Sequence, residues 1–118
     1  FKKPMSDHYA SCEKKMARYQ NNTWNDLYRY AEAIFSYLSL KTKIAEQLVP
    51  AYRTEDRETL SVIANELLPA LKEKTTSLAL LHRSLWMSEC TMIGWCHLDY
   101  RYAGVAARCE TAMMLLAL

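Results

Sequence analysis

The sequence predicts an all-α fold, an antiparallel bundle of four helices, and two observations carry this prediction. Only two of the 118 residues are glycine and three are proline, which leaves few residues suited to the tight turns of an all-β fold. Apolar residues also recur at spacings of three and four along most of the chain, the period of one helical face. A chain of this length forms its own core, so we expect a single helical domain over residues 1–118.

The first half of the chain contains two expected helices. The first spans about Ser6 to Gln20, and residues 21–23, Asn-Asn-Thr, then offer turn and N-cap chemistry for the next. The second spans Trp24 to about Ala51, and Pro50 is expected to mark its end. Its apolar face is expected to comprise Leu27, Ala31, Ile34, Leu38, Ala45, Leu48 and Tyr52.

The second half contains one long helical segment and a shorter last helix. Thr54 is expected to cap residues 55–90, which begin with acidic side chains that suit the helix dipole. Pro69 should kink this third helix, because its ring removes a backbone donor and crowds the preceding turn. The apolar positions are Leu60, Ala64, Leu67, Leu71, Leu78, Leu81 and Leu85 in the long segment, and Val105, Cys109, Ala112, Met113 and Leu116 in the last helix.

The composition argues against several classes of partner and cofactor. The net charge is +2, from 15 basic and 13 acidic residues interleaved along the chain, which gives no electrostatic signature of binding to nucleic acid or an anionic membrane. The four cysteines, Cys12, Cys90, Cys96 and Cys109, lack the paired short spacings of a zinc site. We therefore expect reduced, partly buried thiols, no metal and no cofactor.

The sequence also bears on location. It contains neither a signal peptide nor an apolar run of the length, about 18 residues or more, that marks a membrane-spanning helix. Unpaired thiols are typical of a reducing compartment. Together these observations favour a cytoplasmic location.

Two parts of the chain carry more apolar surface than one helical face needs. The ending TAMMLLAL has no charged residue after Glu110, and aromatic side chains surround the second helix instead of lining one side of it. Tyr and Trp are amphipathic and tolerate half exposure. The alternative is that another domain or subunit covers part of this surface. The aromatic residues concerned are Trp24, Tyr28, Tyr30, Phe35 and Tyr37.

Both glycines lie in residues 94–104, GWCHLDYRYAG, which we expect to connect the third helix to the last one. Gly94 is expected to provide a turn with positive φ or space for a close approach, and Gly104 to lie near the start of the last helix. Asp99 and Arg101, two residues apart, lie about 200° apart around a helix and so point in different directions. Each should instead pair with a neighbour such as Glu89, Arg83 or Glu110, because an unpaired buried charge is costly.

Residues 80–115 resemble the C-terminal helical region of bacterial β-N-acetylhexosaminidases of glycoside hydrolase family 20. In that family a Leu-Trp pair, an acidic residue, Gly-aromatic, Asp-x-Arg-x-x-Gly and Arg-x-x-Thr-Ala follow one another. The segment AYRTEDRETL, residues 51–60, also resembles the turn before the family's long helix. The chain departs from the family at residues 90–93, Cys-Thr-Met-Ile, and at Ala103. The matching residues are Leu85, Trp86, Glu89, Gly94, Trp95, Asp99, Arg101, Gly104, Arg108, Thr111 and Ala112.

The resemblance implies a non-catalytic role for this chain. Family 20 enzymes remove terminal N-acetylhexosamines with a (β/α)8 barrel, which needs about 250 residues. The chain is therefore expected to be the accessory domain of a longer glycoside hydrolase and to be inactive alone. Its partner would be the catalytic barrel of the same chain or of a second subunit, and it would meet a glycan only through the full enzyme.

Trp95 has two interpretations. In the first, it lies at the end of the bundle and contacts the barrel or its substrate, since aromatic faces stack on sugar rings. Glu89, Asp99 and Arg101 would then brace the loop through charge-assisted hydrogen bonds, with Gly94 and Gly104 as its backbone turns. In the second, Trp95 closes the open end of the bundle as a core residue, because Trp is highly buried on average.

Two other classes of function stay open. One is a stand-alone helical adaptor or dimerisation module. The other is a small helical enzyme of the chorismate mutase type, which holds a dianionic substrate between helices with inward cationic side chains. Cationic residues at such spacings more often lie on solvated faces. The candidates for that cationic site are Arg29, Lys43, Arg83 and Arg101.

Overall fold

The computed structural model describes residues 4–19, 24–90 and 92–117, and every regular element within these ranges is helical. The predicted all-α class is therefore confirmed. Residues 20–23, in which the turn and N-cap before the second helix are predicted, lie outside the described ranges. The elements are α1 (Met5–Ala17), α2 (Asn25–Arg53), α3 (Arg57–Val62), the π-helical turn η1 (Ile63–Leu67), α4 (Leu68–Glu89) and α5 (Trp95–Leu116).

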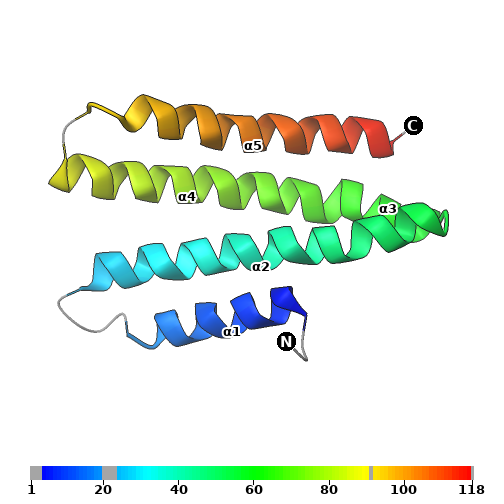
Figure 1. Ribbon diagram of the computed structural model, residues 1–118, viewed down its shortest axis with the longest axis horizontal. Helices are drawn as coiled ribbons and strands as arrows, with labels where there is room; N and C mark the ends of the chain where they lie inside the picture. The colour runs from blue at the N-terminus through cyan, green and yellow to red at the C-terminus, as the bar shows by residue number, and fades with distance from the viewer. Residues whose placement is uncertain (1–3, 20–23, 91, 118) are drawn as a thin grey trace.

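The helices α1, α2, α4 and α5 lie side by side in chain order, and each runs opposite to the one before it (Figure 1). Helix α2 packs against α1 and α4, and α4 packs against α5. The molecule measures 49 × 34 × 21 Å, so along its shortest axis it is about two helix diameters thick. Its radius of gyration, 16.1 Å, exceeds the value of about 13.5 Å expected for a compact domain of this length. The helices therefore form an elongated, flattened layer with two broad faces.

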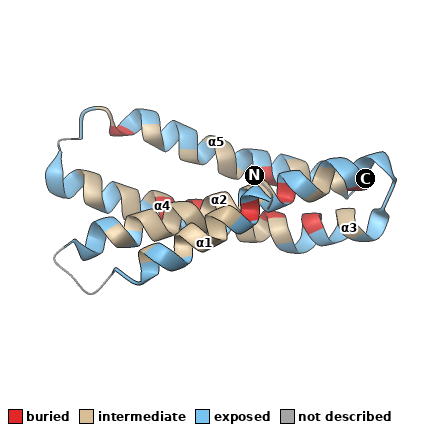
Figure 2. Ribbon diagram, turned by 60° about the horizontal axis from the view of Figure 1, so that its bottom comes forward, coloured by how far each residue is buried: buried red, intermediate tan, exposed pale blue. Residues whose placement is uncertain are grey.

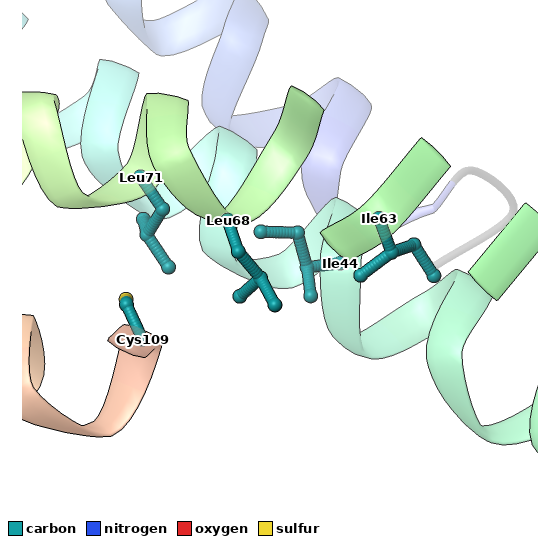
Figure 3. Packing of buried hydrophobic residues seen from close by; sticks show 5 residues of the cluster. All are labelled: Ile44, Ile63, Leu68, Leu71 and Cys109. Atoms are coloured by element: carbon teal, nitrogen blue, oxygen red, sulfur yellow. The ribbon is translucent and has the colours of Figure 1, made fainter. Parts of the chain in front are cut away.

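The aliphatic core lies toward the end of the layer where α2 and α5 finish and α4 begins. Its buried members come from α2, η1, α4 and α5 (Figure 3), and Ile63 has an exposed fraction of 0%. Every apolar residue predicted for the last helix is buried in this cluster or packed against it, so that prediction is confirmed. Few positions elsewhere in the described chain are buried (Figure 2). The cluster comprises Ile44, Ile63, Leu68, Leu71 and Cys109.

The apolar face predicted for α2 is partly wrong. Leu27 and Tyr52 are exposed, whereas Ile44 and Ala51 are buried. The reason is that α2 packs against α1 on one side and α4 on the other, so its contacts do not follow one straight line of positions. Pro50 also does not end the helix at once, because α2 continues to Arg53.

The cap predicted at Thr54 is wrong by two residues. Thr54 is the C-cap of α2, and its hydroxyl donates a hydrogen bond to the carbonyl of Pro50 at 3.0 Å. The N-cap of α3 is Asp56, whose carboxylate accepts hydrogen bonds from the backbone N–H of Thr59 at 3.2 Å and from its hydroxyl at 2.6 Å. Glu55 turns the chain between them with a φ of 54°.

The long third segment is continuous but contains the π-helical turn η1 just before Pro69. Pro69 itself lies directly after η1, in the first turn of α4, and its missing N–H leaves one bond of the continuous helical segment unmade. A π-helical turn carries more residues than an α-helical one, so it rotates the apolar face that follows. This rotation explains why Leu68 and Thr75, which follow the turn, are buried alongside the predicted Leu71 and Leu78.

The last helix begins at Trp95 and not after Gly104, so the prediction that residues 94–104 form a connection is wrong. The chain turns at Gly94 and then contains Leu, Arg and Ala, which have high helix propensity. Gly104 lies inside α5, and a Cβ atom placed on it would meet no atom within 4 Å. Gly104 therefore provides neither a turn nor a close approach.

Candidate functional site at the aromatic end

The end of the layer opposite the aliphatic core holds a cluster of aromatic rings from α2, α4 and α5. His82 lies at its centre, with ring centroids 4.8 Å from Tyr30, 5.0 Å from Trp95 and 5.8 Å from Tyr102. Trp86 lies 5.9 Å from Trp95. Such distances are typical of tilted and edge-to-face aromatic pairs. We call Tyr30, His82, Trp86, Trp95 and Tyr102 the aromatic cluster.

Polar atoms inside the aromatic cluster are paired and uncharged near neutral pH. The Nδ1 atom of His82 and the hydroxyl of Tyr102 form a hydrogen bond of 2.7 Å. Burial lowers the pKa of His82 below its usual 6.5. Burial also raises the pKa of Tyr102, and the neighbouring Tyr30 adds to this effect. The hydrogen bond between His82 and Tyr102 therefore fixes the relative orientation of two rings of the cluster.

Trp95 is buried, with 3% of its surface exposed. Its indole Nε1 donates a hydrogen bond of 2.7 Å to Oδ1 of Asp99, one helical turn later. The same carboxylate oxygen lies 3.5 Å from Nη2 of Arg83 in α4, which is one of the partners expected for it. This burial favours the interpretation of Trp95 as a core residue, and Asp99 links it to α4.

The other residues predicted to brace this region lie on the surface. Glu89 and Arg101 are exposed, and within the described part of the chain neither forms an ion pair. Glu110, another expected partner, instead pairs with Lys72. The structure therefore brings Asp99, Arg83 and Trp95 together, and it leaves Glu89 and Arg101 apart from them.

Gly94 has a φ of 93°, the left-handed conformation expected of it, which strains any residue with a side chain. It follows Met92 and Ile93, whose exposed fractions are 76% and 85%. Large apolar side chains exposed to this degree, one after the other, are typical of a surface that another molecule covers. Two apolar residues directly before a turn-forming glycine are a signal of such a surface that is visible in the sequence.

Neither a cationic substrate site nor a metal site is formed by the described residues. Arg29, Lys43, Arg83 and Arg101 are all exposed, whereas the chorismate mutase alternative needs inward cations. Residues 4–19, 24–90 and 92–117 contain no group of three His, Cys, Asp or Glu that could hold a metal. Cys90 and Cys96 are exposed, Cys12 is partly buried, and Cys109 is a buried thiol whose pKa is raised by burial.

The surface of the chain is large for its mass. Its accessible area is 8468 Å², whereas a folded monomer of this mass exposes about 6,600 Å². No helix in the described ranges is both long and apolar enough to cross a bilayer. The difference of about 1,900 Å² exceeds the area of about 800 Å² that one partner buries in a standard protein interface.

Comparison with known proteins identifies the family. No curated protein matches the chain. The family model described as the Glycoside Hydrolase 20C C-terminal domain matches residues 1–117, nearly the whole chain. The helical layer with its aromatic end therefore belongs to the family of Glycoside Hydrolase 20C C-terminal domains.

Proposed function

We propose that this chain is the non-catalytic C-terminal domain of a longer family 20 glycoside hydrolase, a β-N-acetylhexosaminidase that removes terminal N-acetylhexosamine. The domain packs against the catalytic barrel of its own chain or of a second subunit. Family membership supports the glycosidase assignment. The observation that carries the packing is the flattened layer, with its accessible area of 8468 Å².

The packing unit in this proposal is the whole antiparallel helical bundle, residues 1–118, with its third helical segment bent at Pro69. The connection between α4 and α5 makes the contact with the barrel, because Met92 and Ile93 are the most exposed large apolar side chains of the described residues. Trp95 then acts from inside the domain, where it holds the start of α5 in place. The exposed thiols of Cys90 and Cys96 fit a reducing cytoplasm.

Asp99, Glu89 and Arg101 brace the connection between α4 and α5, Asp99 from within the domain and the other two across the interface. Asp99 braces it within the domain through Trp95 and Arg83. Glu89 and Arg101 are exposed and would pair with charges of the barrel, where desolvation strengthens such pairs. Gly94 provides the turn that presents Met92 and Ile93.

The test compares three samples: the 118-residue chain, the full-length enzyme, and the catalytic segment expressed without this domain. A chromogenic N-acetylglucosaminide should be hydrolysed by the full-length enzyme and not by the 118-residue chain. The catalytic segment should bind the separate chain in a calorimetric titration. Turnover by the 118-residue chain alone, or a full-length protein without a barrel, would show that the proposal is wrong.

A matched pair of double variants tests the contact surface. Replacing Met92 and Ile93 by Ser should weaken binding to the catalytic segment by about 100-fold, since exposed apolar anchors at an interface contribute about 2 kcal/mol or more. Replacing Met114 and Leu115 by Ser, which are also exposed but lie at the other end of α5, should leave binding unchanged. If both double variants weaken binding to the catalytic segment equally, the connection between α4 and α5 is not the contact surface.

A stand-alone dimerisation module is the second candidate, because a second copy of the chain could also cover the large accessible area. Sedimentation of the 118-residue chain separates the two functions. A stable dimer that does not bind the catalytic segment would favour the dimerisation module. A monomer that binds the catalytic segment supports the proposal.

A further inference from the structure

A hollow lies beside the aromatic cluster, between the start of α2 and the end of α4. Its volume is ≈ 540 Å³, within the range of about 300–1,000 Å³ that is typical of small-molecule sites. Trp24 and Tyr30 line it from α2 and its cap, and Trp86 lines it from α4. The hollow therefore has aromatic walls from two neighbouring helices.

The Trp86 side of the hollow is fixed by packing against other aromatic rings. The ring of Trp86 packs against buried Trp95 at 5.9 Å and against His82 at 6.4 Å, between centroids. A Cβ atom placed on Gly94 would lie 3.6 Å from Cζ2 of Trp86, so the turn also borders this ring. A ring fixed before binding loses little conformational entropy when a ligand packs on it.

The other wall is open to solvent. Trp24 is 63% exposed, which is unusual for the largest apolar side chain. It occupies the N-cap position of α2. Exposed Trp side chains are frequent at surfaces that bind a partner or a ligand.

Polar residues also line the hollow. Asp26, Ser88 and Glu89 line it together with the aromatic residues. A pyranose ring has one face of C–H groups, which packs on aromatic rings, and hydroxyl groups around its edge, which donate to carboxylates. A flat ring surface edged by carboxylate acceptors matches both parts of a sugar.

We propose that the hollow between Trp24 and Trp86 is a glycan-binding subsite of this domain, which takes one or two N-acetylhexosamine units of a longer glycan. The aromatic rings stack on the sugar, and Asp26 accepts hydrogen bonds from its hydroxyls. The sugar class rests on the proposed function. The subsite lies beside the connection that contacts the barrel, so it would hold the part of the glycan that extends away from the cleaved terminal residue.

The experiment is a titration of the ¹⁵N-labelled 118-residue chain with chitotriose, followed by NMR. The three Trp residues give three indole N–H signals, which serve as reporters within one sample. The signals of Trp24 and Trp86 should shift on binding, and that of buried Trp95 should shift least. If the Trp24 and Trp86 signals do not shift with up to about 20 mM chitotriose, the proposed subsite is wrong. Even weak binding would be detected at that concentration.

Variants separate sugar stacking from an effect on folding. Trp24→Ala should weaken chitotriose binding by about tenfold or more, and Asp26→Asn by about threefold, with unchanged melting temperatures. Tyr100→Ala is the matched control, because Tyr100 is an exposed aromatic residue of α5 outside the hollow, and it should bind like the unaltered chain. Equal affinity of Trp24→Ala and the unaltered chain would overturn the proposal.

The result also separates this inference from the proposed function. If Trp24→Ala releases the catalytic segment and no sugar shifts the Trp signals, the hollow is a protein contact and the subsite is wrong while the packing proposal stands. If chitotriose binds the chain but the catalytic segment does not, the packing proposal fails and the subsite stands.

Discussion

The two ends of the helical layer are built from different chemistry. At one end Ile44, Ile63, Leu68 and Leu71 form an aliphatic core, closed by Cys109 (Figure 3). At the other end the aromatic cluster combines large rings with a hydrogen bond between His82 and Tyr102 and another between Trp95 and Asp99. Aliphatic packing is non-directional and depends on buried area. Aromatic rings with hydrogen bonds fix orientation as well as area, so the aromatic end is the better place to present a defined surface.

The largest expected effect is at the aromatic end. Trp95→Ala should lower the free energy of unfolding by about 3–5 kcal/mol, because it empties a buried site and removes the donor to Asp99. Thermal and urea melts of the 118-residue chain measure this loss. Tyr100→Ala, exposed and five residues further along α5, is the control and should stay within about 0.5 kcal/mol. An unchanged stability of Trp95→Ala, with lost binding to the catalytic segment, would instead support Trp95 as a contact residue.

At the aliphatic end, Ile63→Ala should destabilise the chain by about 2–5 kcal/mol, because Ile63 is fully buried in the π-helical turn. The urea midpoint should fall without a change in the slope of the transition. Val62→Ala changes the neighbouring, exposed residue and should have little effect. Similar losses for the two variants would mean that the π-helical turn does not orient Ile63 into the core.

The two ends should differ in their response to acid. The folded chain lowers the pKa of His82 from 6.5 by burial, so folding favours the neutral ring. The stability from His82 is therefore complete above about pH 6.5 and decreases as the pH falls toward the folded pKa. Urea midpoints between about pH 7 and pH 5 should fall in the unaltered chain and fall less in His82→Gln. Glu46 and Asp56, whose pKa values are lowered by hydrogen bonds from Ser6 and Thr59, lose their contribution only at lower pH. If the urea midpoints of the unaltered chain and of His82→Gln fall equally with pH, His82 does not contribute this pH dependence.

The smallest expected effect is at the salt bridge of Lys72 and Glu110, which joins α4 to α5 beside the aliphatic core. The two side chains are 40% and 59% exposed, so water and salt screen the pair. Lys72→Ala should cost less than about 1 kcal/mol, measured by urea melts at low and high salt. A loss as large as that of Ile63→Ala would show that this surface pair contributes like the core.

The parts of the fold that follow from local periodicity could be predicted from the sequence. Val105, Cys109, Ala112, Met113 and Leu116 lie on one face of a single regular helix, and all reach the core. Gly94 also has the positive φ predicted from its residue type. Both features depend on the residues of one segment alone, so no knowledge of the neighbouring helices is required.

The parts that depend on tertiary packing could not be predicted. Ile63 and Leu68, five residues apart, share the buried face because η1 is a π-helical turn, and no residue type marks such a turn. Leu27 is exposed because α2 divides its surface between two neighbours. Trp95 is buried because rings from α4 and α5 meet around it, whereas the same residue on a lone helix would be accessible. The burial of Trp95 therefore depends on the packing of neighbouring helices, which its own segment does not reveal.

The order of the helices has a kinetic consequence. Because α1 packs on α2, α2 on α4 and α4 on α5, the main contacts join segments that follow one another along the chain. Topologies dominated by such local contacts fold in about microseconds to milliseconds, whereas long-range strand pairing is slower. In the proposed full-length enzyme, the helical layer would thus finish folding before a (β/α)8 barrel closes, and a preformed apolar surface would be ready to cover the barrel as it forms.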